Sequence, residues 1–326
     1  MLSLSPSFAG PLCLEWDFAL HLPARLIGMP RPAALPYIWM LLGAASFSVM
    51  AALTAGLKDQ CDWQWIAIAR TGLAMIFAAS LAICGGARLV FFRPGKLWMR
   101  SMAGSVSLVC GFYAMTHYPV SEVLTLTNMF PLWVALLSWP LLGQMPPLDT
   151  WPAMLVGLVG IVLMQQPDFQ GAGANLAIAA AVLSSFTSAV AMIGLHQVRE
   201  IDTRAIVAHF SAVALAACVA ALFLFPRTRP LALDLKTIPL LVGVGLSATI
   251  GQLFLTKAFT SGPPARISVV GLTQVGFTML LEIAFWHRTF SPLTLVGIAL
   301  VIAPTAWTLL RTSRKTPVTV ISETPA

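Results

Sequence analysis

The chain has 326 residues, of which 58% are hydrophobic and only 10% are charged, and its mean hydropathy is +0.85. A soluble globular protein carries about 25% charged residues, so this composition argues against a water-soluble enzyme and indicates an integral membrane protein. The net charge is +7, but the 19 Lys and Arg residues cluster between apolar segments and form no basic stripe interleaved with aromatic residues. We therefore expect the lipid bilayer, and no nucleic acid, as a partner.

The first residues, 1–34, contain several prolines and no sustained apolar stretch, and we expect them to form a cytoplasmic arm. The polar residues 312–326 are expected to form a cytoplasmic tail. Between them, each membrane-spanning helix needs about 20 mostly apolar residues. The predicted fold class is an all-α membrane protein with ten transmembrane helices. The ten segments are 36–57, 63–84, 97–116, 120–142, 150–166, 173–196, 204–225, 237–260, 265–287 and 291–311.

The Lys and Arg residues indicate how the chain is oriented. If the N-terminus is cytoplasmic, 13 of the 19 lie in loops or near span ends on the inner side and five lie on the outer side, which agrees with the positive-inside rule. An even number of spans returns the chain to the side where it began. We therefore predict a multi-pass protein of the cell membrane with both termini in the cytoplasm.

The two halves of the chain resemble each other at a nearly constant offset. "AASFSVM" at 44–50 corresponds to "LSSFTSA" at 183–189, and "AMTHYPVSE" at 114–122 corresponds to "AFTSGPPAR" at 258–266. Each half then has five spans, and an odd number places the second half upside down relative to the first. This arrangement is an inverted repeat, which is common in secondary transporters. The predicted repeats occupy residues 35–168 and 169–311.

Ten spans in a five-plus-five repeat resemble the EamA branch of the drug/metabolite transporter superfamily. The fourth span reads "PVSEVLTLTNMFPLW…LLGQ" and precedes "WPAMLVGLVGIVL", while the second half gives "PPARISVVGLTQVG…FWHRTFSPLTLVGIAL". The resemblance implies a secondary transporter, working as an exporter by alternating access, for a small polar metabolite such as an amino acid or for a drug-like molecule. Gln144 and Arg288 depart from the family pattern, because they stand where the family usually has Glu.

The fourth span carries polar side chains and a proline in a segment that otherwise suits lipid. Thr125 and Asn128 share one helical face with Ser121, and this face either lines a cavity or binds neighbouring helices. Pro131 removes one backbone donor and frees the carbonyl of Thr127, so we predict a polar spot near the middle of the membrane. The candidate substrate-binding residues are Thr125, Asn128, Pro131, Gln252, Gln274, Ser46 and Ser185.

Charged residues in the spans are candidates for gating or coupling, because a charge in lipid is costly. Arg70 lies well inside the second span, where it either ties helices together or binds an anion. Glu122 and Arg266 occupy matching positions in the two repeats, and Arg266 either contacts the substrate path or extends to the headgroups. Glu282 is a candidate proton carrier, and Lys257 lies near the inner end of the eighth span. We take Glu122, Arg70, Lys257 and Glu282 as the gating or coupling candidates.

Three classes of function stay open at this point: a secondary transporter, a membrane-embedded enzyme and a non-transporting scaffold. An enzyme would need a catalytic constellation at a water-accessible depth, whereas Glu122 and Glu282 are the only carboxylates in the ten segments. The sequence contains no Walker loop and no dinucleotide fingerprint, and its cysteines lack metal-site spacing. We therefore predict a transporter of a small molecule with no enzymatic activity, no cofactor and no metal, and leave proton coupling and a homodimer open.

Overall fold

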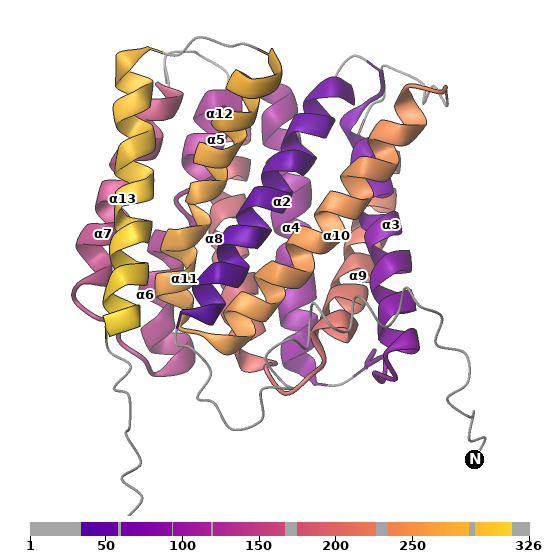
Figure 1. Ribbon diagram of the computed structural model, residues 1–326. Helices are drawn as coiled ribbons and strands as arrows, with labels where there is room; N and C mark the ends of the chain where they lie inside the picture. Colours follow the sequence, from indigo (N-terminus) through magenta and orange to yellow (C-terminus); the bar gives the residue numbers. More distant parts are fainter. Residues whose placement is uncertain are drawn as a thin grey trace, which may run out of the picture.

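The computed structural model describes the hydrophobic part of the chain as a bundle of helices (Figure 1). Every regular element in the residues that it describes is an α-helix. The predicted arm, apart from Ala34, and the tail beyond Arg314 lie outside these residues. The structure describes residues 34–57, 60–92, 94–118, 120–166, 175–225, 234–286 and 291–314.

Seven helical stretches of the described chain are, by length and composition, able to cross a membrane. They are α2, α3, α8, α9 and α10, together with the stretches 123–142 and 264–285, which include parts of two helices each. α7 and the apolar part of α13 are shorter, and α4 carries Lys96 and Arg100 in its first two turns. The helices are α2 (Leu35–Leu57), α3 (Trp63–Cys84), α4 (Gly95–His117), α5 (Val120–Thr127), α6 (Phe130–Leu142), α7 (Thr150–Gln165), α8 (Asn175–Gln197), α9 (Thr203–Leu224), α10 (Thr237–Ser261), α11 (Pro264–Gly271), α12 (Thr273–Trp286) and α13 (Pro292–Arg314).

The predicted fourth and ninth spans are each divided into two helices, α5 with α6 and α11 with α12. At each break the backbone makes a tighter turn: the N–H of Met129 donates to the carbonyl of Leu126, and the N–H of Leu272 donates to that of Val269, both at 3.2 Å. Pro131 is the second residue of α6, where an N–H would have no partner within the helix. This corrects the expectation that Pro131 interrupts a continuous helix, because it lies in the first turn of a new one.

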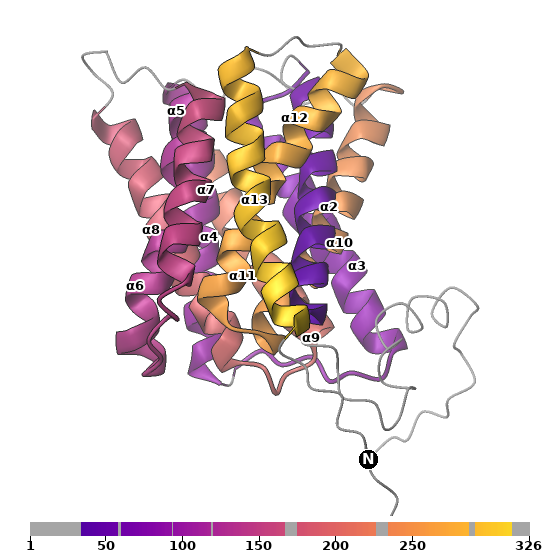
Figure 2. The same ribbon diagram turned by 60° about the vertical axis from the view of Figure 1, so that its left-hand side comes forward.

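The two broken segments are arranged in opposite directions in the bundle. Figures 1 and 2 show α5 and α12 toward one end and α6 and α11 toward the other. The closest helix pairs are α2 with α10, α3 with α9, α4 with α8 and α7 with α13. In the last pair, a Cβ atom on Gly160 would lie 2.8 Å from the carbonyl oxygen of Gly297, so only glycine allows this approach.

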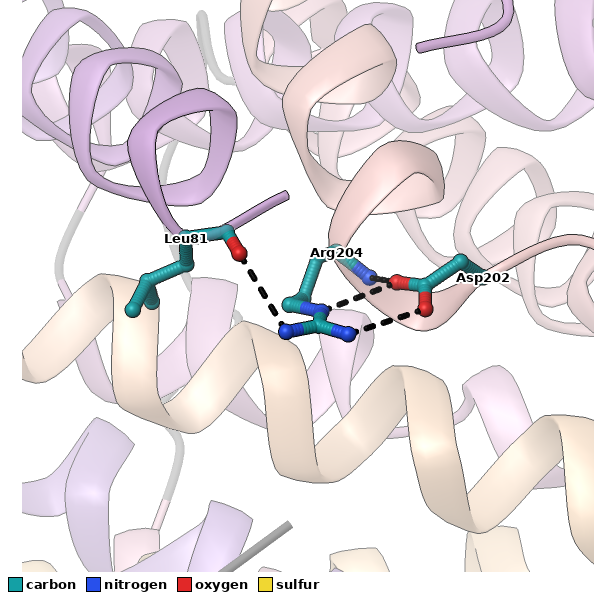
Figure 3. A network of polar contacts seen from close by, with 3 residues as sticks. All are labelled: Leu81, Asp202 and Arg204. Carbon is teal, nitrogen blue, oxygen red and sulfur yellow. Dashed lines mark hydrogen bonds and ion pairs between the residues drawn. The ribbon is translucent and has the colours of Figure 1, made fainter. Parts of the chain in front are cut away.

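Arg204 joins the end of α3 to the start of α9 (Figure 3). Its Nε and Nη2 atoms donate to the two carboxylate oxygens of Asp202 at 3.2 and 3.3 Å, and its Nη1 donates to the carbonyl of Leu81 at 3.2 Å. The Asp202 carboxylate also accepts the backbone N–H of Arg204 at 2.8 Å and so caps α9. Arg204 is only 7% exposed, and the Asp202 carboxylate supplies the counter-charge for its buried guanidinium.

Candidate substrate-binding cavity

A cavity of about 260 Å³ lies between the two halves of the chain. Residues from α2, α3, α4 and α5 line it on one side, and residues from α8, α9, α10 and α12 complete it. Small-molecule sites usually enclose roughly 300–1,000 Å³, so this cavity lies just below that range and suits a molecule at the small end of it. Its wall combines apolar side chains with two arginines, two glutamines and three serines.

Arg100 of α4 is the most deeply buried polar group in this wall, with 1% of its surface exposed. Its guanidinium carbon lies 3.9 Å from the ring centroid of Phe210 on α9, which is a close cation–π contact. Gly104, one turn later, makes room for this arrangement, because a Cβ atom there would lie 2.5 Å from Nη1 of Arg100. The sequence therefore places a cation, an aromatic ring and a gap for the guanidinium at one site.

Arg70 of α3 also lines the cavity, and its guanidinium carbon lies 6.0 Å from the ring centroid of Phe47 on α2. Arg70 is seven residues from the start of its helix and Arg100 is five from the start of the next one. Consecutive spans run in opposite directions, so at 1.5 Å per residue the two Cα atoms lie roughly 10 and 8 Å from opposite ends of the bundle. The cavity thus has one guanidinium toward each end.

Three serines tie α4 to α8 along the cavity wall. Ser107 Oγ donates to the carbonyl of Ser184 at 2.9 Å, and Ser184 Oγ donates to the carbonyl of Ser107 at 2.8 Å. Because the single hydroxyl proton of Ser107 is used in this bond, the 2.6 Å contact between Ser188 Oγ and Ser107 Oγ has Ser188 as the donor. Ser188 is half-buried and borders the open space.

The helix breaks deliver two further polar residues to the cavity. Thr127 is the last residue of α5, and Gln274 is the second residue of α12. The hydroxyl of Thr127 donates to the carbonyl of Val123 at 2.9 Å. Gln252 of α10 lines the same space, is 7% exposed, and has no hydrogen-bond partner for its Nε2 among the described residues.

Of the residues predicted from the sequence, the structure brings Arg70, Gln252 and Gln274 together around this cavity. Thr125 and Asn128, which the helical pattern selected, do not line it. Thr125 is buried, and the side-chain amide of Asn128 donates to the carbonyl of Leu124 in its own helix at 2.7 Å.

Four other candidates also lie away from the cavity. Ser46 donates to the carbonyl of Leu42 in its own helix at 2.8 Å, and Ser185 accepts the indole N–H of Trp133 at 3.0 Å, which ties α6 to α8. Pro131 is buried in the first turn of α6. The ammonium of Lys257 lies 5.1 Å from the ring centroid of Trp39.

The structure describes the side chain of only one of the three charged residues in the broken segments, that of Arg266. Glu122 lies on α5 and Glu282 on α12, but their side chains are outside the described part of the structure, so their roles stay predictions. Arg266, at the start of α11, donates through Nη2 to both carboxylate oxygens of Asp149, at 3.1 and 3.2 Å. This ion pair joins α11 to the start of α7. The sequence alone had left two alternatives for Arg266, a contact with the substrate path or with the lipid headgroups.

Sequence reasoning missed Arg100 and the three cavity serines as site residues. Arg100 lies near the start of its predicted span, where the positive-inside rule already accounts for a basic residue. Gly104, one turn beyond it, was an available signal, because a small residue at that spacing leaves room for a long side chain along the helix. The serines carried a weaker signal, since hydroxyls in membrane helices often bond only to their own backbone.

The comparison with known proteins agrees with this architecture. The model of the EamA-like transporter family matches the chain twice, over residues 34–165 and 172–310. The pseudopaline exporter CntI of Pseudomonas aeruginosa is 27% identical over 266 residues, which are 80% of this chain and 91% of that protein. An uncharacterized transporter of Helicobacter pylori is 25% identical over 225 residues, 66% of this chain and 74% of that one.

A solved crystal structure of another protein shares the fold, with a TM-score of 0.74 at 17% sequence identity. The likeness covers 87% of this chain and 99% of that chain. Together with the two family matches, which span most of the sequence, the helical bundle and its membrane-crossing stretches settle the class of protein. The chain belongs to the EamA-like transporter family and is an integral membrane transporter of small molecules.

Proposed function

We propose that the protein exports a small polar metabolite, such as an amino acid, or a drug-like molecule, by alternating access around the cavity between its two halves. The observation that carries this proposal is the cavity itself, since polar groups from both halves line one open space in an otherwise apolar bundle. Export as the direction is supported by the relative that is named an exporter.

The proposed architecture is ten membrane spans in two inverted five-helix repeats, over residues 35–168 and 169–311. The helix contacts support it. In this repeat, each span of the first half corresponds to the span five places later in the chain. The contact between α2 and α10 then corresponds to the contact between α8 and α4. The contacts α3–α9 and α7–α13 each join two corresponding spans. The same correspondence relates the two broken spans, each of which begins with an eight-residue helix. The two separate family matches have nearly the same division.

The proposed orientation has both termini on the cytoplasmic side of the cell membrane. Two observations support it. The positively charged residues favour this side by the positive-inside rule. In addition, α2 begins and α13 ends at the same end of the bundle (Figure 1).

Proton coupling is the energy source that we propose for the exporter. The carboxylates that support it are Glu122 and Glu282, because each belongs to one of the two broken spans. A homodimer is a further prediction, because the exposed apolar faces of the helices could pack against a second copy in the bilayer.

Cysteine accessibility tests the proposal without knowledge of the substrate. Ser188→Cys places a thiol at the cavity, and Ser185→Cys on the same helix is a matched control, because Ser185 is 1% exposed and does not line the cavity. Both variants are made after the native cysteines have been replaced by alanine. Each is then treated with an impermeant thiol reagent in right-side-out and inside-out membrane vesicles.

Alternating access predicts that the thiol of Ser188→Cys reacts from both sides of the membrane, whereas that of Ser185→Cys reacts from neither. A static scaffold or an enzyme with a fixed opening would give labelling at position 188 from one side at most. Such one-sided labelling, under every condition in which the variant is folded, would overturn the proposal.

A further inference from the structure

Arg100 combines deep burial with unused hydrogen-bonding capacity. Only 1% of its surface is exposed, yet its Nε and Nη1 atoms have no hydrogen-bond partner among the residues that the structure describes. Its neighbour across the cavity wall is the ring of Phe210, whose face attracts the cation but accepts none of its N–H bonds in the usual geometry. A buried charge in this condition is unfavourable unless something else satisfies it.

Arg204 shows what a satisfied buried arginine looks like in the same protein. It is 7% exposed, and its three guanidinium nitrogens all donate, two to Asp202 and one to Leu81. The difference lies in the surroundings, because Arg100 lines a cavity, whereas the guanidinium of Arg204 contacts Asp202 and Leu81 (Figure 3). Arg100 therefore lines a space that a ligand can enter, and its Nε and Nη1 donors lie buried just behind that surface.

The rest of the cavity wall presents the same chemistry. Arg70 adds a second guanidinium, and Gln252, 7% exposed, adds an Nε2 donor that has no partner among the described residues. The described lining contains no Asp or Glu. The cavity is thus rich in positive charge and hydrogen-bond donors, and a ligand there would have to supply acceptors and negative charge.

We infer that the solute that enters this cavity is a small organic anion, whose carboxylate is bound by Arg100, while Arg70 and Gln252 add positive charge and a hydrogen-bond donor elsewhere in the wall. A planar carboxylate accepts two N–H bonds from a guanidinium and supplies the missing counter-charge. The apolar part of the wall, which includes Phe47, Phe112 and Leu255, suits the carbon skeleton of such a molecule and has no use for a bare inorganic ion. The inference rests on the proposed function, because it names the chemical class of the exported molecule.

Two glutamine variants test the role of Arg100 without any ligand. Arg100→Gln removes a buried charge that has no counter-charge among the described side chains, so its melting temperature in detergent should equal or exceed that of the wild type. The control, Arg204→Gln, breaks a complete network and should melt several degrees lower. If Arg100→Gln loses as much stability as Arg204→Gln does, Arg100 is a structural tie and the inference fails.

Binding is then measured with matched probes on the purified full-length protein. Glutarate and benzoate, each compared with its neutral amide, should raise the melting temperature of the wild type, and the amides should not. In Arg100→Gln the apparent affinity for the carboxylates should fall about tenfold or more, as expected for a lost charged hydrogen bond. Arg100→Lys, which keeps the charge but loses the planar fork, should bind more weakly than the wild type.

The outcomes separate the inference from the proposed function. No carboxylate response in the wild type, an equal response to the amides, an equal response to inorganic phosphate at the same ionic strength, or unchanged binding in Arg100→Gln would overturn the anion site. If any of these is found while the thiol at position 188 reacts from both sides, export by alternating access stands and only the substrate class is wrong. If carboxylates bind but labelling is one-sided, the anion site stands and transport fails.

Discussion

Ser107 on α4 and Ser184 on α8 each donate a hydrogen bond to the other's backbone carbonyl, at 2.9 and 2.8 Å. This reciprocal pair fixes the two helices beside the cavity, and both serines are buried. In the proposed repeat, α4 with α8 corresponds to α10 with α2, the pair on the other side of the bundle. The two hydroxyls therefore hold α4 and α8 together, and they also line the cavity.

Ser184→Ala should destabilise the protein by about 0.6 kcal/mol and by no more than about 1.7 kcal/mol, the average and the maximum for hydrogen bonds between membrane helices. Reversible unfolding in mixed detergent micelles gives this number. Thr187→Ala is the control on the same helix, because the Thr187 hydroxyl donates to the carbonyl of Leu183 within α8 at 2.7 Å. An equal loss in both variants would show that the contact between helices contributes nothing beyond a local bond.

Pro131→Ala should leave the stability within about 0.5 kcal/mol of the wild type and leave the helix break in place, because Pro131 lies where an added N–H finds no helical partner. The second half supports this expectation, since α12 follows a similar break at Leu272 and has Gln274 as its second residue, the place that Pro131 has in α6. Unfolding and cysteine accessibility at position 188 measure the two effects. Loss of labelling from one side would show that the proline is needed for the conformational change.

The apolar segments and most helix ends follow from the sequence, since lipid demands long runs of apolar residues with their backbone bonds satisfied inside each helix. The side of each helix that meets the cavity does not follow. In lipid, both the packed and the outer faces of a helix are apolar, so periodicity selects no inner face. Thr125 and Thr127 illustrate this, because both are threonines on α5 and only Thr127 lines the cavity.

The roles of the polar residues were equally hard to predict, because each depends on a partner far along the chain. Ser48 donates to the carbonyl of Gln274, which lies 226 residues away, whereas Ser46 bonds only within its own helix. Arg100 and Arg204 lie in the first turns of predicted spans. The tertiary structure shows that Arg204 pairs with Asp202, whereas Arg100 has no ion pair with the side chains that the structure describes. Sequence could therefore define the helices but not the chemistry between them.

The ion pair of Asp149 with Arg266 should contribute only about 0.2–1 kcal/mol, because both side chains are partly exposed, at 33% and 23%. A double-mutant cycle with Asp149→Asn and Arg266→Gln measures the coupling energy, and added salt should reduce it. Exchanging the two charges should recover part of the stability that either reversal alone removes. A coupling energy of zero at low salt would contradict the contact.

Acid should weaken the junction between α3 and α9. Burial alone raises the pKa of the Asp202 carboxyl, but its hydrogen bonds with Arg204 and the charge of that residue outweigh burial and hold the pKa below its ordinary value. A depressed pKa means that the stabilisation is complete above the unfolded pKa of about 3.9 and is lost as the pH falls through the folded one. Asp202→Asn keeps a capping oxygen but removes the charge.

The free energy of unfolding of the wild type should therefore fall more steeply than that of Asp202→Asn as the pH drops below about 5. Above that pH the variant should be the less stable of the two. Unfolding curves at matched ionic strength give both slopes. Parallel slopes in acid would mean that Asp202 does not titrate differently in the folded and unfolded protein.

Gly104→Ala should impair anion binding through Arg100. The added methyl carbon would lie 2.5 Å from Nη1 of Arg100 and 2.8 Å from Cε2 of Phe210, so the guanidinium must move away from its place in the cavity. Gly111→Ala is the control, because it borders the same cavity and its methyl carbon would meet only Ser184 Oγ, at 3.2 Å. Overpacking of this kind costs about 1–3 kcal/mol.

We therefore expect Gly104→Ala to lose some stability and, separately, about tenfold in apparent affinity for glutarate, the loss expected when a charged hydrogen bond to Arg100 is not made. Gly111→Ala should bind glutarate almost as the wild type does. Thermal shift titrations at equal protein concentration provide both measurements. The added methyl group and the guanidinium cannot both keep their places, because they would lie too close together. If Gly104→Ala is folded and still binds glutarate with wild-type affinity, the position of the Arg100 guanidinium does not determine anion binding.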